Sequence, residues 1–144
     1  SANSQMATQL EGHITPTSSS NKIRITVCGF FMIPTQHNSS FQIKRSTNGG
    51  SSYGGLDATV QSSENVSRAT GHIPSLWGRG HNWSDNVNSI ATVIDSPNTT
   101  SEVTYKMQFY KAMGTNFIIG GTYQTQDANK GSMPTFMTAK EVGA

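Results

Sequence analysis

The 144-residue sequence has little of what many domains use for cross-linking or membrane anchoring. Its single cysteine, Cys28, excludes an intrachain disulfide. No apolar stretch approaches the roughly 18 residues that are needed to span a bilayer. The N-terminus shows no basic segment followed by an apolar one, so we expect no signal peptide. These absences argue against membrane insertion and against a disulfide framework.

Charge is also scarce. Only 12% of the residues are charged, whereas a typical globular domain has about 25%. The net charge is +2 and like charges form no run, so nucleic acid and anionic membranes are poor partner candidates. Ser, Thr, Asn and Gln supply 55 of the 144 residues. Such a neutral polar surface is common on secreted modules and on virion proteins.

Helical periodicity is absent, and alternation of apolar and polar residues with period two recurs instead. The clearest case is residues 103–111, where Val103, Tyr105 and Met107 alternate with polar residues. Asn48-Gly49 is a strong hairpin turn signal. Further strands are expected at residues 9–15, 22–33, 40–45, 58–61, 89–94, 116–123 and 135–142, with a long irregular segment at 62–88. The pattern predicts one all-β domain over residues 1–144, an antiparallel β-sandwich or jelly roll of about eight strands.

The strand at residues 22–33 changes character along its length. Ile23, Ile25 and Val27 share one face and alternate with polar residues. From Cys28 onward both faces become apolar, which predicts that both are covered. The second layer of the domain would cover one face and another subunit the other. Cys28 would then act as a small hydrophobic residue.

Three motifs follow one another along the chain: "ITPTSSSNKIRITV" at residues 14–27, "DSPNTTSEVTYKMQFY" at 95–110 and "FMTAKEVGA" at 136–144. Together they resemble the C-terminal modules of tail-fibre and related structural virion proteins of tailed phages, especially marine cyanophages. The resemblance implies a C-terminal module of a virion surface protein, normally a homotrimer, whose distal loops meet the host. Within the second motif, Asp95-Ser96-Pro97 suits a turn, so this motif would specify the scaffold and leave function to other loops.

The best functional candidate is the stretch "GHIPSLWGRGHNWSDN" at residues 71–86, which contains both tryptophans. Tryptophan faces stack on sugars, and Asn, Asp and Arg side chains hydrogen-bond hydroxyls. Loops on a rigid β scaffold often carry recognition. The alternative is that the tryptophans plug the end of the sandwich or a subunit seam. The candidate ligand-binding residues are His72, Trp77, Arg79, His81, Asn82, Trp83 and Asp85, together with Tyr53 in a separate Gly/Ser-rich loop.

Catalytic and metal-binding patterns are not evident. The four histidines form no His-x-His pair, and none has the ligand spacing of a zinc site. No spacing among the eight carboxylates predicts the facing pair that a glycosidase needs. Nucleophile elbows, phosphate loops and metalloprotease motifs are also missing. We therefore expect no enzymatic activity, no metal and no cofactor.

These observations predict a phage virion protein, assembled in the bacterial cytoplasm, that binds a host-surface glycan or lipopolysaccharide. Its partners would be its own copies, other virion proteins and the host surface, and repetition of weak sites would supply avidity. Three alternatives stay open. They are a purely structural capsid decoration or fibre protein, a carbohydrate-active depolymerase with an acidic cleft between subunits, and a free-standing lectin.

Overall fold

The computed structural model describes residues 4–32, 39–56, 86–111, 118–120 and 134–143, and in these residues it contains eight β-strands. The strands are β1 (Ser4–Ile14), β2 (Lys22–Met32), β3 (Ser39–Ser46), β4 (Gly54–Gly55), β5 (Asn86–Asp95), β6 (Val103–Lys111), β7 (Ile118–Ile119) and β8 (Phe136–Val142). Among the described residues we find no helix with the length and apolar character needed to cross a membrane. The fold class is all-β, as the alternation predicted.

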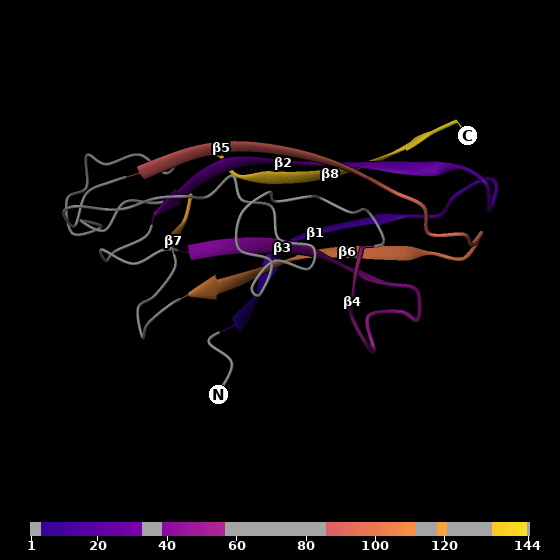
Figure 1. Cartoon of the computed structure of the whole chain (residues 1–144), viewed down its shortest axis with the longest axis horizontal. Helices are drawn as coiled ribbons and strands as arrows, with labels where there is room; N and C mark the ends of the chain where they lie inside the picture. Colours follow the sequence, from indigo (N-terminus) through magenta and orange to yellow (C-terminus); the bar gives the residue numbers. More distant parts are fainter. Residues whose placement is uncertain (1–3, 33–38, 57–85, 112–117, 121–133, 144) are drawn as a thin grey trace, which may run out of the picture.

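The strands form two antiparallel sheets that lie in two layers (Figure 1). The first sheet has the order β1-β6-β3-β4. In the second sheet β2 is central and pairs with β5 along one edge. On the other edge β8 pairs with residues 22–28 of β2, and β7 pairs with residues 31–32. This arrangement is consistent with the predicted β-sandwich.

Three of the strand pairs within the two sheets are nested along the chain. β1 pairs with β6, β2 with β5, and β3 with β4. β6 also pairs with β3. This pairing brings segments that are distant in sequence side by side within each sheet.

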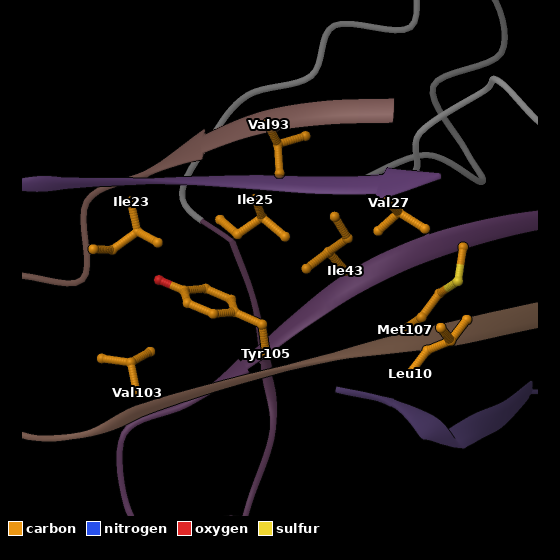
Figure 2. Packing of buried hydrophobic residues seen from close by; sticks show 9 residues of the cluster. All are labelled: Leu10, Ile23, Ile25, Val27, Ile43, Val93, Val103, Tyr105 and Met107. Carbon is orange, nitrogen blue, oxygen red and sulfur yellow. The ribbon is translucent and has the colours of Figure 1, made fainter. Parts of the chain in front are cut away.

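Alternation in β2 and β6 supplies most of the core (Figure 2). Ile23 and Ile25 of β2 and Tyr105 of β6 are each 0% exposed. Side chains of the two inner faces meet because successive residues of a strand point to opposite sides. The buried hydrophobic residues are Leu10, Ile23, Ile25, Val27, Ile43, Val93, Val103, Tyr105 and Met107. The predicted inward faces of residues 22–27 and 103–107 are confirmed.

Several strand limits differ from the sequence-based expectation. β1 begins at Ser4 rather than at residue 9. Residues 86–88 were expected to be irregular, and this was wrong: they belong to β5 and pair with residues 30–32 of β2. The sequence there lacks a clear apolar alternation, so pairing with a long central strand decides its conformation. The strand expected at residues 58–61 lies outside the described residues, and of the strand expected at 116–123 only β7 and Gly120 are described.

The hairpin turn after β3 is confirmed. Gly49 and Gly50 adopt positive φ values of 68° and 83°, which glycine reaches without steric cost. The Ser46 hydroxyl accepts a hydrogen bond from the Gly50 amide at 2.9 Å. The chain then returns as the two-residue strand β4. The turn places Tyr53 immediately before β4.

Unlike a typical core strand, β5 points its two isoleucines, Ile90 and Ile94, away from the core. Ile90, Thr92 and Ile94 share one side, as predicted, but this side points out of the sandwich, and Ile90 is 68% exposed. Val93 and Asp95 point inward and are buried. The inner face of β5 therefore ends in a carboxylate. We call the outward-pointing side of β2, β5 and β8 the outer face of the second sheet.

Gly29 of β2 is predicted to be essential for packing. A Cβ atom at this position would lie 2.3–2.6 Å from side-chain atoms of Thr135. Overpacking of this kind typically costs about 1–3 kcal/mol. Gly29→Ala should therefore lower the free energy of unfolding by this amount, as measured by urea denaturation.

The matched control is Gly12→Ala, where the new Cβ would meet Ala139 at an ordinary 3.6 Å. Adding Thr135→Gly to Gly29→Ala removes the clashing atoms, and the double-mutant cycle should show a favourable coupling. Equal stability of Gly29→Ala and Gly12→Ala would contradict the close approach.

Candidate functional site

The predicted ligand-binding residues are described only in part. His72, Trp77, Arg79, His81, Asn82, Trp83 and Asp85 all lie outside the described residues. Their roles therefore stay predictions. The chain that carries them enters β5 at Asn86, which pairs with Met32 at one end of the second sheet. Tyr53 is the one member of the set that the structure places.

Tyr53 lies half-buried beside the first sheet. The Lys106 ammonium of β6 is 5.3 Å from the centroid of its ring, which is a cation–π distance. Lys106 in turn forms an ion pair with Glu11 of β1 at 2.7 Å. The ring therefore belongs to a polar cluster on the outward side of the first sheet, and a lysine already occupies one of its faces.

The same cluster extends to His13. Its Nε2 atom lies 2.7 Å from a Glu11 oxygen, and its Nδ1 atom lies 3.2 Å from the Thr104 hydroxyl. The hydrogen bond from Lys106, followed by the one from His13, lowers the pKa of Glu11. The same Glu11 contact raises the pKa of Lys106. These charges compensate one another on a solvated surface, where such pairs add little stability.

A second polar cluster is buried between the sheets. The Asp95 side chain is 0% exposed and accepts hydrogen bonds from Arg45 Nη1 at 2.8 and 3.0 Å. The Tyr105 hydroxyl donates to Oδ2 of the same carboxylate at 2.8 Å, so this oxygen accepts from both residues. Burial, reinforced by the Asp95 charge, raises the pKa of Tyr105, so the phenol keeps its proton and remains a donor. The three residues form one charge-assisted network that joins β5 to β3 and β6.

This role of Asp95 differs from the sequence-based interpretation, which placed the residue in a turn. Asp95 is the last residue of β5 and points inward, on the same side as Val93. The turn follows it: Pro97 is buried, and Asn98 takes a positive φ of 52°. The sequence did contain the signal, because Asp95 continues the inward alternation of Val93. An inward aspartate needs a partner, and the alternation alone does not identify Arg45.

A third polar cluster joins the first and last motifs. Glu141 of β8 accepts hydrogen bonds from the Thr17 amide at 2.7 Å, from the Thr17 hydroxyl at 3.0 Å and from the Asn21 amide group at 2.8 Å. The Asn21 hydrogen bond, with help from Thr17, lowers the pKa of Glu141. One carboxylate thus organises the Ser/Thr-rich link between β1 and β2.

Asp95 of the second cluster and Glu141 of the third lie in the same row of the second sheet, on either side of β2. Ile23 of β2 is opposite Asp95 on one side and opposite Glu141 on the other. One residue of each of the three motifs singled out in the sequence therefore lies in this row, near one end of the sandwich. The entry to β5 at Asn86 is at the opposite end of the same sheet.

The described carboxylates show structural contacts. Asp95 and Glu141 belong to the clusters above, and Glu11 and Glu102 both contact His13, at 2.7 and 3.8 Å. Within the described ranges, no group of three or more His, Cys, Asp or Glu residues is arranged to hold a metal ion. The described carboxylates thus make contacts that hold strands and links of the scaffold together.

Comparisons with protein-family models, with curated proteins and with solved structures found no match to this chain. Its function must therefore be inferred from its own residues and geometry.

Removal of the Asp95 carboxylate is predicted to destabilise the fold strongly. Asp95→Ala removes the carboxylate that pairs with Arg45, whose side chain is only 17% exposed, and breaking such a buried ion pair costs about 3 kcal/mol or more. Urea unfolding followed by tryptophan fluorescence measures the loss. The matched control is Glu102→Gln, because Glu102 is 61% exposed and should change stability by less than about 0.5 kcal/mol. Similar losses in the two variants would show that the network is not a main determinant of stability.

Stability should also fall in acid, in part through Glu141. Its folded-state pKa is lower than its ordinary value of 4.5, so folding is favoured above that value and the contribution disappears as the pH falls through the folded-state pKa. Thermal unfolding between pH 7 and pH 3 measures this dependence. In Glu141→Gln the unfolding temperature should fall less steeply between pH 7 and pH 3. An unchanged fall in that variant would exclude a contribution from the hydrogen bonds of Glu141.

Proposed function

We propose that this chain is a trimeric surface module of a phage virion that binds a host-surface glycan. The observation that carries the proposal is that the three motifs that resemble phage virion proteins share one row of the second sheet, at Ile23, Asp95 and Glu141. Asp95, Tyr105 and Glu141 all belong to these motifs, and all three make the polar contacts that hold the links in place. Residues that carry the resemblance thus also make hydrogen bonds that stabilise the fold, which supports the proposal.

The nested strand pairing supports a jelly-roll interpretation within this proposal. Pairs β1–β6, β2–β5 and β3–β4, with β6 also beside β3, follow the order of a hairpin rolled into two sheets. Jelly rolls are frequent in viral structural proteins and in lectin domains. A scaffold of this type holds its loops at the ends of the sandwich.

Homotrimer formation is the second element of the proposal. In the described part of the chain β1 and β5 each pair with a neighbouring strand on one side only. Long strands with an unpaired edge associate readily unless something covers them. Packing against two further copies would cover such edges.

Glycan recognition is assigned to the segment before β5. That segment carries both tryptophans. It joins the sheet at the end opposite the polar clusters around Asp95 and Glu141. A framework that is held rigidly at one end would support recognition loops at the other. Three copies of a weak site would raise avidity through multivalency.

The proposal predicts a trimer in solution. Light scattering at neutral pH without added metal should give about three times the chain mass of 15.5 kDa. Trp77→Ala and Trp83→Ala should keep this mass and lose binding to an array of bacterial surface polysaccharides.

Other results point to the alternatives. A clean monomer that still binds the array would favour a free-standing lectin. A trimer that binds no polysaccharide would favour a purely structural virion protein, and release of shorter sugars from the array would favour a depolymerase.

A further inference from the structure

The outer face of the second sheet is organised in three parallel rows of different chemistry. The register of β2 with β5 and β8 defines these rows, since residues directly opposite one another share a face. Successive rows lie two residues apart along β2, which is about 7 Å. From one end of the sheet to the other, the rows are cationic, hydroxylic and apolar.

The first row is cationic. Arg24 of β2 lies directly opposite Lys140 of β8, and Lys22 projects from the same face two residues away. All three are exposed. Like charges directly opposite each other destabilise a sheet. Among the described outward-facing positions of β2, β5 and β8 there is no carboxylate to compensate them.

The second row consists of threonines. Thr26 of β2 lies between Thr92 of β5 and Thr138 of β8. The Thr26 and Thr92 hydroxyls are 3.2 Å apart and hydrogen-bonded, which fixes their rotamers. Each hydroxyl can both donate and accept a hydrogen bond. This row therefore presents ordered groups that suit a polyhydroxylated ligand.

The third row is apolar. Cys28 of β2 lies between Ile90 of β5 and Phe136 of β8. Ile90 is 68% exposed and Phe136 is 48% exposed. Both are among the largest exposed hydrophobic residues of the described chain, and the third of these, Ile94, lies on the same face, opposite Arg24. An exposed apolar patch beside unpaired cations indicates an interaction surface.

We propose that this outer face binds an acidic polysaccharide, with Arg24 and Lys140 as the carboxylate- or sulfate-binding pair. The cations match the acid groups, the threonine row matches sugar hydroxyls, and Phe136 offers an aromatic face to sugar C–H groups. A second copy of the chain fits less well, because it would bring a further set of unpaired cations to the interface. The inference rests on the proposed function and adds a second, charge-reading site to the loop site.

The test uses the full chain with three immobilised polymers: polygalacturonate, dextran sulfate and neutral dextran. We expect binding to at least one of the two acidic polymers, weakening as salt is raised, and none to neutral dextran. The double variant Arg24→Gln/Lys140→Gln should bind about tenfold more weakly. Its matched control is Lys44→Gln, because Lys44 lies on β3 in the other sheet, and this variant should bind as well as the unmodified protein.

Loss of the apolar and hydroxyl contacts gives an independent readout. Phe136→Ala and Thr138→Val remove no charge, so each should weaken binding while leaving its salt dependence unchanged. If Arg24→Gln/Lys140→Gln keeps the salt dependence of the unmodified protein and Lys44→Gln weakens binding equally, the attraction is nonspecific and the proposal is overturned.

The remaining outcomes are equally decisive. Absence of binding to both acidic polymers overturns the proposal, as does binding to anionic phosphatidylglycerol vesicles alone. A change of solution mass on Phe136→Asp would make the face a subunit interface instead. Array binding that needs the tryptophans and ignores Arg24→Gln/Lys140→Gln would remove this site alone, whereas a loss of all polysaccharide binding would remove the proposed function as well.

Discussion

The arrangement of the two sheets depends on one buried carboxylate. Asp95 ends β5 in the second sheet, and its oxygens are held by Arg45 and Tyr105 from the first. Apolar contacts between the inner faces are non-directional, so they stabilise the stacking without selecting one offset between the sheets. A buried charge with fixed partners does select one, because any slip leaves the charge unpaired. We regard this network as the element that sets the register of the sandwich.

Glu141 extends the same constraint across the second sheet. It lies in the row that contains Ile23 and Asp95, and it binds the link between β1 and β2 through Thr17 and Asn21. Two carboxylates thus hold both sheet-crossing links of one end. Ordering these links has an entropic cost, and the hydrogen bonds at Glu141 offset part of it.

Among the described residues, the polar contacts that hold the links lie at one end of the sandwich. Two surfaces lie elsewhere: the entry to β5 at Asn86 is at the far end, and the outer face of the second sheet exposes Ile90 and Phe136. We propose that the first carries the glycan-binding loop and the second reads acidic sugars. A fibre-like module that repeats both sites would combine local selectivity with avidity.

The sequence by itself determined the all-β class, the inward faces of β2 and β6 and the turn at Gly49, because these follow from local alternation and turn chemistry. The nested pairing was decided by tertiary structure, and so was the strand character of residues 86–88, which need β2 as a partner. The outward exposure of Ile90 was also a tertiary outcome, since alternation identifies two faces but not which one is buried. Of the predicted ligand-binding residues the structure places only Tyr53, beside Lys106. The partners of Asp95 were decided in the same way, because Arg45 lies 50 residues away in the chain and only the packing of one sheet on the other brings the two charges together.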